Sequence, residues 1–427
     1  MNRLALLFSC SLSVAAGIAA VGCSGGNDST NSAQPPAPPS PPPPGGSVAP
    51  TLTRSVFMPA PGAPSLANPW DLAFTADGQY LFFTEKCRGL SVRHPNGNVV
   101  RLFGTAGSAS IADDFFCEGQ SGMHGVALDP DFAVNRAVYV YMPSTRSNPR
   151  TNRVVRLTVN ATVTNVGERV DIVQDISFKN TWLNGDPSGA GAHSGGRIRF
   201  GPDRYLYITT GDNHSGPLPQ DLSRLGGKVL RVDRNGAAAP GNNTPSGGDP
   251  RIFTYGHRNV QGIAFRPGTD QPFVSEHGPG HSDEVTPLVA GGNGGWDPLC
   301  TNGINYCGYT SNQANGSPTP MTDTAKFPNA MRPSWNNDGR SQGMGPSTFL
   351  SGSQWKAWDG RLAVGIMGGQ RLEILELDAA GTGIGTTNLT SAPYNLPAAR
   401  YRSLVQGPDG SLYIATDAGE IWRVVPN

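Results

Sequence analysis

The chain has 427 residues, of which 15% are charged, and its 32 Lys plus Arg balance 32 Asp plus Glu. A chain without net charge carries no electrostatic footprint of nucleic-acid binding. Its 37% hydrophobic residues fit neither wholesale disorder nor a polytopic membrane protein. Glycine (56) and proline (38) are abundant, together about 22% against roughly 12% in average proteins, so we expect one or more soluble, loop-rich domains.

Residues 1–22 predict a bacterial lipoprotein signal peptide. A short basic start is followed by an apolar run, and the segment ends in Ala-Val-Gly before Cys23, which resembles a lipobox. Cleavage there would make Cys23 a lipidated N-terminus, anchored in a membrane of the bacterial cell envelope as a periplasmic or surface lipoprotein. An ordinary signal peptide cut elsewhere, or an uncleaved anchor, are the alternatives.

Residues 23–50 predict a disordered tether. They contain a proline-rich stretch over residues 35–44, which favours extended polyproline II and cannot build a core. We therefore expect the folded domain to occupy residues 51–427.

Four cysteines fall within that domain, Cys87, Cys117, Cys300 and Cys307. Outside the cytoplasm an even number predicts disulfides, and the short separation of Cys300 and Cys307 favours that pair together with Cys87–Cys117. A zinc site is the alternative, but the sequence has neither a CxxC nor an HExxH motif.

The domain repeats one pattern six times: an apolar strand, a turn built on Pro-Asp or Asp-Gly, and a second apolar strand. The repeats start at Trp70, Met123, Gly196, Gln261, Thr348 and Arg402. Starts about 50–90 residues apart leave room for two further strands each, which is typical of propeller blades. The sequence predicts an all-β fold, a six-bladed β-propeller whose rim loops converge on a central channel. A β-sandwich followed by a second domain would not explain six similar turns.

A histidine and an aspartate flank one blade of this predicted propeller. His193 comes just before the inner strand of the third repeat, and Asp212 follows the next strand. Antiparallel pairing brings both to the same end of the blade. A carboxylate that orients an imidazole makes a general base, although a structural histidine beside a glycine-rich turn fits the same pattern.

Two pairs of polar residues precede other inner strands. Arg258 and Asn259 offer many donors to a planar anionic or carbonyl-rich ligand, or else form a salt-bridged turn between blades. Arg400 and Arg402 alternate along a strand and so share one face. Their charges repel unless an anion lies between them, and a di- or tricarboxylate ligand is the natural candidate.

A Gly278-Pro279 pair, followed by Asp283 and Glu284, can present backbone carbonyls and carboxylates to a hard cation such as Ca²⁺. Gly-Pro turns are common, so this signal is weak by itself.

Together, four segments resemble the soluble, pyrroloquinoline quinone (PQQ)-dependent aldose sugar dehydrogenases. The segments are AHSGGRIRFGPDRYLYITTGD, YGHRNVQGIAF, SEHGPGHSDEV with the later GGNGGW, and RYR. Their order and spacing match from about residue 60 to the C-terminus. The resemblance implies oxidation of an aldose at its anomeric carbon to the lactone, with PQQ and Ca²⁺ as cofactors.

The resemblance also implies roles for individual residues. His193 would take the hydroxyl proton, Asp212 would orient His193, and Arg258 would stabilise negative charge on the quinone oxygens. The remaining implied contacts are Asn259, Arg400 and Arg402 to PQQ, Gln120 to the sugar, Gly278 and Pro279 carbonyls to Ca²⁺, and Glu284 with a carbonyl near Gly294 to a second, structural calcium.

The sequence departs from the family at three places. Glycine stands near Gly368, where a lysine that contacts PQQ is usual, and Arg371 is a candidate to compensate. His277 replaces a glutamine, and Gly294 replaces a tyrosine. These changes leave open a calcium-dependent lactonase-type hydrolase, and also a propeller that has become a binding or adhesion module.

The other rim histidines, His124, His214 and His281, are expected to be hydrogen-bonded loop residues rather than catalysts. No CxxCH haem motif occurs in the sequence, so the resemblance implies that electrons leave to a separate acceptor, a quinone or a cytochrome.

Overall fold

The computed structural model describes residues 48–180, 189–299, 306–308, 318–337 and 339–427. The expected signal peptide, Cys23, almost all of the expected tether, and Cys300 lie outside the described residues. Within the described ranges, no helix combines the length and hydrophobicity that crossing a membrane requires.

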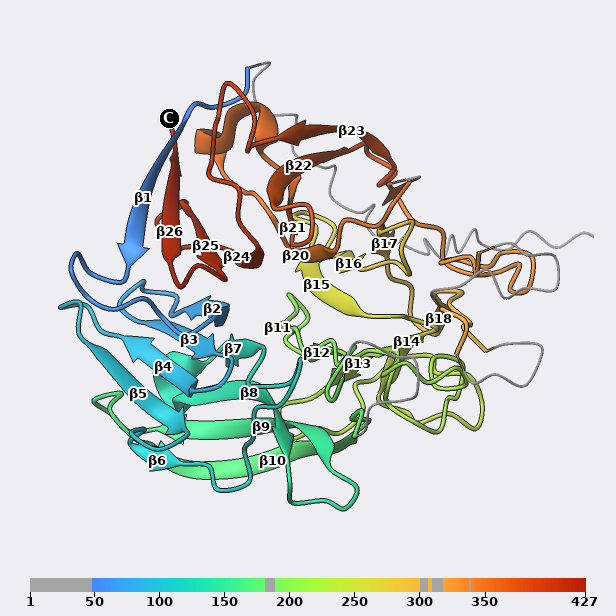
Figure 1. The fold of residues 1–427 in the computed structure, drawn as a ribbon, viewed down its shortest axis with the longest axis horizontal. Coiled ribbons are helices and arrows are strands. Elements are labelled where there is room, and N and C mark those ends of the chain that lie inside the picture. The colour runs from blue at the N-terminus through green and yellow to red at the C-terminus, as the bar shows by residue number, and fades with distance from the viewer. Residues whose placement is uncertain (1–47, 181–188, 300–305, 309–317, 338) are drawn as a thin grey trace, which may run out of the picture. The chain divides into compact units, whose positions relative to one another are not determined.

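The folded body is a six-bladed β-propeller, as the six repeats predict. Six sheets surround a common centre, and the first strand of each sheet lies innermost (Figure 1). The innermost strands are β2 (Pro69–Phe74), β7 (Val126–Leu128), β11 (Ile198–Phe200), β15 (Val260–Phe265), β20 (Met344–Phe349) and β24 (Tyr401–Gln406). Each lies at the start of one of the six sequence repeats.

The outer strands complete the blades in chain order. In the first three blades they are β3 (Leu81–Glu85), β4 (Gly89–Arg93), β5 (Val99–Gly104) and β6 (Ser110–Ile111); β8 (Ala137–Ser144), β9 (Thr151–Val159) and β10 (Val166–Ile176); and β12 (Leu206–Thr209), β13 (Lys228–Val232), β14 (Ile252–Tyr255) and β18 (Gly292–Asn293). In the last three they are β16 (Pro272–Glu276), β17 (Glu284–Pro287) and β19 (Trp335–Asn336); β21 (Leu362–Ile366), β22 (Arg371–Leu377) and β23 (Gly383–Asn388); and β25 (Leu412–Thr416), β26 (Ile421–Pro426) and β1 (Leu52–Met58). The helical segments among the described residues are α1 (Phe132–Asn135) and the 3₁₀ turn η1 (Ser353–Trp358).

The Gly-Pro-Asp turns explain why the repeats look alike. In the third and sixth blades the turn aspartate, Asp203 or Asp409, accepts the backbone N–H two residues later, at 3.2 and 3.1 Å. Its other oxygen accepts the hydroxyl of Tyr207 at 3.0 Å or of Tyr413 at 3.1 Å. Asp thus satisfies the turn backbone and fixes a tyrosine of the returning strand.

The ring is closed by the two ends of the folded body. Strand β1 is the outer strand of the last blade and pairs antiparallel with β26, from Leu52 opposite Pro426 to Val56 opposite Trp422. Thr51 and Asn427 exchange backbone hydrogen bonds of 3.2 and 2.9 Å. Chain closure therefore pairs an edge that would otherwise be open.

The core lies between the blades. Six clusters of buried apolar side chains each join two neighbouring sheets. In one, Phe82 of β3 and Val140 of β8 are both fully buried. Burying such a side chain contributes roughly 1.5–3 kcal/mol, so these clusters hold the blades in fixed positions and leave the rim loops to carry polar residues.

Candidate functional site

A cavity of about 420 Å³ opens where loops from all six blades meet around the centre. Its lining residues are Asn68, Trp70, Lys86, Gly119, Gln120, His124, Gly191, His193, Ser194, Gly195, Asn259, Gln261, His277, Met367, Arg400, Arg402 and Asp417. Five of the residues predicted for the site, Gln120, His193, Asn259, Arg400 and Arg402, are among them.

The structure brings His193 and Asp212 together. His193 Nδ1 lies 2.7 Å from Asp212 Oδ1, and both side chains are buried. The glycines around them permit the close approach. A Cβ on Gly195 would lie 2.6 Å from Thr210 Cα, and one on Gly211 would lie 2.1 Å from the His193 carbonyl oxygen. The glycine-rich sequence is therefore a packing requirement of this pair.

Asp212 is held by four donors. Oδ1 accepts from His193 Nδ1 and from the backbone N–H of His214 at 2.9 Å, and Oδ2 accepts from Trp296 Nε1 at 2.8 Å and from the Tyr306 hydroxyl at 3.0 Å. Burial would raise the pKa of Asp212, but His193 and the other neighbours outweigh it and lower that pKa well below its usual range. The carboxylate is thus ionised and fixed in place.

His193 is a neutral imidazole at neutral pH. Burial, followed by the charge of Arg258, lowers the pKa of His193 well below 6.5 in spite of Asp212. Its other nitrogen, Nε2, lies 2.9 Å from Nε2 of His214, whose side chain is also buried. Sequence reasoning set His214 aside as a loop histidine. A polar residue two positions after Asp212, in the turn that leaves the strand, was the available signal.

The His193, Asp212 and His214 side chains bring one possible metal-ligating atom each within 4.8 Å of one another. Two observations argue against a cation there. Both oxygens of Asp212 already accept hydrogen bonds, and Lys179 Nζ lies 3.0 Å from Nδ1 of His214. An ammonium so close disfavours a second positive charge.

A second wall of the cavity is cationic. Arg400 Nε lies 3.1 Å from Asp417 Oδ2, and Arg402 contacts both Asp417 oxygens, at 2.5 and 2.8 Å. The sequence argument that only a ligand could relieve the repulsion between the arginines is therefore wrong, because Asp417 supplies the intervening anion. With Lys86, the charged lining residues are three cations and one carboxylate.

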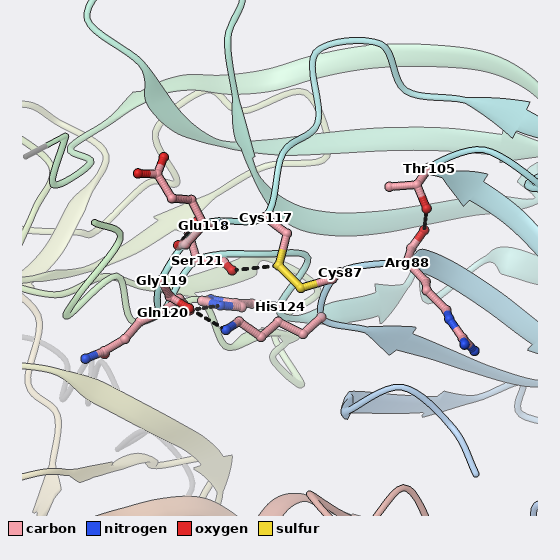
Figure 2. The surroundings of a disulfide bond; sticks show 10 residues. Cys87, Arg88, Thr105, Cys117, Glu118, Gly119, Gln120, Ser121 and His124 are labelled. Carbon is pink, nitrogen blue, oxygen red and sulfur yellow. Dashed lines mark hydrogen bonds between the residues drawn. A yellow bond between two sulfur atoms is a disulfide. The ribbon is translucent and has the colours of Figure 1, made fainter. Parts of the chain in front are cut away.

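Lys86 is a cavity residue that the sequence analysis missed. It follows strand β3, and its Nζ donates to the Gly119 carbonyl at 2.6 Å, beside Gln120 (Figure 2). Burial and the charge of Arg402 lower the pKa of Lys86, while Asp417 raises it. Its proximity to Arg402 depends on two blades meeting, which no local pattern reveals.

The expected Cys87–Cys117 disulfide is present and supports this region (Figure 2). It ties the residue after Lys86 to the loop that carries Gln120. Cys307 is also disulfide-bonded, and its expected partner Cys300 lies outside the described residues.

Arg258 lies behind the cavity wall. Its side chain is fully buried and donates from Nη1 to the His277 carbonyl at 2.7 Å. Glu276 holds this segment because one of its oxygens accepts the backbone N–H groups of Arg258 and Asn259. Asn259 reaches the cavity, and its Oδ1 accepts from Gly195 N at 3.2 Å and Gln261 Nε2 at 2.9 Å.

The segment expected to bind Ca²⁺ follows His277. Gly278 and Pro279 are buried, and the Gly278 carbonyl lies 2.8 Å from His277 Nδ1. The Gly278 N–H donates to Asp283 at 2.8 Å, and Asp283 also accepts from the hydroxyl of Ser341 at 2.6 Å. These contacts give the loop a defined shape around the two carbonyls.

The two residues expected to hold a second calcium have different neighbours. Glu284 is buried on β17 and accepts from the Thr322 hydroxyl at 2.8 Å. Burial, with the nearby carboxylates of Glu276 and Asp283, raises the pKa of Glu284 to about 8. Gly294 instead donates its N–H to the Tyr255 carbonyl at 2.7 Å.

Gly368, which stands where the family lysine is usual, borders a second cavity of about 380 Å³ that shares His277, Met367 and Arg400 with the first. Arg371 bonds to Glu373 and Gln342. Its charge is therefore already neutralised by a carboxylate, which weakens the hypothesis that it compensates for the lysine.

A buried His–Asp pair that faces a positively charged cavity at the mouth of a six-bladed propeller defines the class of protein as a propeller with an acid–base site on its axis. The chain belongs to the glucose/sorbosone dehydrogenase family of oxidoreductases, whose profile matches residues 66–423.

Individual relatives agree with this family. An aldose sugar dehydrogenase of Escherichia coli (strain K12) is 29% identical over 366 residues, covering 84% of this chain and 91% of that protein. The quinoprotein glucose dehydrogenase B of Acinetobacter calcoaceticus is 30% identical over 280 residues, 58% of this chain and 54% of that protein. A crystal structure of a glucose dehydrogenase matches with a TM-score of 0.71 at 27% identity, covering 88% of this chain and 99% of that one.

Proposed function

We propose that this protein is a PQQ- and Ca²⁺-dependent aldose dehydrogenase that oxidises the anomeric carbon of a sugar to the lactone. The observation that carries the proposal is the His193–Asp212 pair, 2.7 Å apart, on a cavity whose opposite side carries Lys86, Arg400 and Arg402. One wall can accept a proton and the other can bind carboxylates.

The cavity fits PQQ by its charge. Three cations against one carboxylate leave a net positive lining, which suits a ligand with several carboxylates. Lys86, Arg400 and Arg402 would hold those groups, and Asn259 would hold the cofactor edge. Bound PQQ would supply the acceptor for the hydride that leaves the anomeric carbon. The quinoprotein relative from Acinetobacter supports this assignment.

His193 would act as the general base. A neutral imidazole with its Nδ1–H on Asp212 can accept the hydroxyl proton of the sugar at Nε2. The fixed carboxylate then stabilises the imidazolium that forms, and Trp296 and Tyr306 keep the carboxylate in position. Gln120 would contact the sugar. The charge of Arg258, close behind the wall, would favour electron density arriving on a quinone oxygen.

Ca²⁺ would bind the Gly278 and Pro279 carbonyls, which are hard oxygen ligands. The ion would replace the His277 contact to the Gly278 oxygen. A second calcium at Glu284 and Gly294 is a weaker part of the proposal, because their neighbours differ. Prolonged chelation of the loaded protein should lower its melting temperature, since a ligand of the native state stabilises it by mass action.

We further propose that Cys23 is lipidated and that residues 23–50 tether the propeller to a membrane of the bacterial cell envelope. Electrons would pass to a separate acceptor, a quinone or a cytochrome.

The test is reconstitution of purified apoprotein with PQQ and CaCl₂. We expect a shift of PQQ absorbance and dye reduction with at least one member of an aldose panel. A protein that binds no PQQ below millimolar concentration would be a binding module. Lactone hydrolysis without PQQ would identify the hydrolase instead.

A further inference from the structure

Three side chains lead in a line to the proposed base. Lys179 Nζ lies 3.0 Å from His214 Nδ1, His214 Nε2 lies 2.9 Å from His193 Nε2, and His193 Nδ1 lies 2.7 Å from Asp212. All four side chains are buried, at 6% exposure or less. Each contact joins a specific pair of atoms, so the position of every proton can be assigned.

The direction of the hydrogen bonds follows from Asp212. An ionised carboxylate only accepts, so Nδ1 of His193 carries a proton and Nε2 of this neutral ring carries the lone pair. Nε2 of His214 must then carry the proton of the 2.9 Å bond. Burial lowers the pKa of His214 to about 4, so that ring is also neutral, and its Nδ1 accepts from the ammonium of Lys179.

The turn places His214 there by construction. Asn213 and His214 both have left-handed backbone conformations, with φ of 50° and 54°, which non-glycine residues adopt only where the surroundings hold them. Asn213 Nδ2 donates to the His193 carbonyl at 2.8 Å and to the Ala192 carbonyl at 3.2 Å. The turn is therefore fastened to the segment that carries the base.

The contact has a direct consequence for base catalysis. A neutral imidazole has one lone pair in the plane of its ring, and on His193 that lone pair accepts the proton of His214. A sugar hydroxyl that donates to His193 needs the same lone pair. The two donors must compete for it.

We propose that His214 is a positioning residue for His193, which holds the base's lone pair until a sugar hydroxyl replaces it. The replacement part of this inference rests on the proposed function. In the reaction the hydroxyl proton forms a new N–H bond at Nε2 of His193, the O–H electron pair stays on the sugar oxygen, and His214 keeps its own proton.

The hydrogen bond also tunes the proton affinity of His193. Asp212 raises that affinity, whereas Arg258 and His214 lower it. Lys179 faces His214, and Tyr306 donates to Asp212. A donor bound to the neutral ring favours the neutral form. Removing the donor should therefore raise the pKa of His193 and move the acidic limb of kcat/KM to higher pH.

The test compares His214→Gln, whose amide can still donate, with His214→Leu, which cannot. In apoprotein with ¹⁵N-labelled histidine, NMR should show a proton on Nδ1 of His193 and on Nε2 of His214. The titration of His193 should move up by about one pH unit in the leucine variant, the effect of one hydrogen bond, and stay near the wild-type position in the glutamine variant. His94→Leu, on a distant turn where His94 contacts the Val163 carbonyl, is the control and should change neither.

In reconstituted enzyme, the leucine variant should show a lower KM for the sugar, because the sugar displaces nothing, and the glutamine variant should retain the wild-type KM. A proton on Nδ1 of His214 in the wild type, or equal His193 titrations in both variants, would overturn the inference. The wild-type spectrum decides this even if the leucine variant does not fold. If the spectrum is as expected but no aldose is oxidised, the hydrogen bond stands, and the replacement step falls together with the proposed function.

Discussion

The two walls of the cavity differ in how they hold their polar groups. The base wall, formed by His193, Asp212 and His214, is buried, and its proton positions follow from a single carboxylate with four donors. On the cationic wall of Lys86, Arg400, Arg402 and Asp417, the Arg400 and Arg402 side chains keep 43% and 24% of their surface exposed.

This difference indicates which wall carries chemistry and which carries affinity. Burial fixes the proton affinity of His193 and gives it a single orientation, as a base needs. The cationic wall keeps its arginines in place through Asp417 while leaving them a net charge that a ligand can meet. Changes on the base wall should therefore affect the rate, and changes on the cationic wall should affect cofactor binding.

The largest expected effect is on the base wall. His193→Ala should lower sugar oxidation by ~10²–10⁴, the usual contribution of a general base, while PQQ binding changes little. The measurement is dye reduction at saturating PQQ, beside a PQQ titration of the same protein. His94→Ala serves as the matched control. Wild-type turnover by the His193 variant would remove the distinction between the walls.

The cationic wall gives the opposite split. Arg402→Ala should weaken PQQ about ten- to a hundredfold, because charge-assisted hydrogen bonds contribute ~1.5–3 kcal/mol each, with kcat at saturating PQQ nearly unchanged. Lysine should rescue only in part, since a point charge lacks the planar fork. A titration of apoprotein in excess Ca²⁺ measures this. A loss of kcat without a loss of PQQ affinity would assign Arg402 to catalysis instead.

The sequence predicts the propeller because its signals are local. A Gly-Pro-Asp turn and its flanking strands lie within one repeat, and the contacts of Asp203 and Asp409 that shape the turn span at most four residues. The pairing of His193 with Asp212 was predictable for the same reason, since both lie at one end of a single hairpin.

The rest of the site depends on distant segments. Asp417 meets Arg400 and Arg402 across a hairpin of the last blade, and Lys86 joins them from the first blade. His214 reaches the base only because the turn after Asp212 takes an unusual backbone conformation. Neither residue type nor periodicity reports such meetings, so the sequence argument placed the compensating charge on Arg371 rather than Lys86.

The smallest expected effect decides between those two cations. Lys86→Met should weaken PQQ roughly two- to tenfold, the range expected for one partly exposed charge, and the difference should shrink at high salt because exposed charges are screened. Arg371→Met should leave the affinity within about twofold, because Glu373 and Gln342 already engage that guanidinium. Both variants are read in the titration used for Arg402, at low and high ionic strength. Methionine keeps the length of either side chain, so packing changes little and charge is the variable. If Arg371→Met were the weaker binder, the anionic end of the cofactor would lie toward Gly368 and the second cavity, and the cationic wall would have to be redrawn around that side of the propeller.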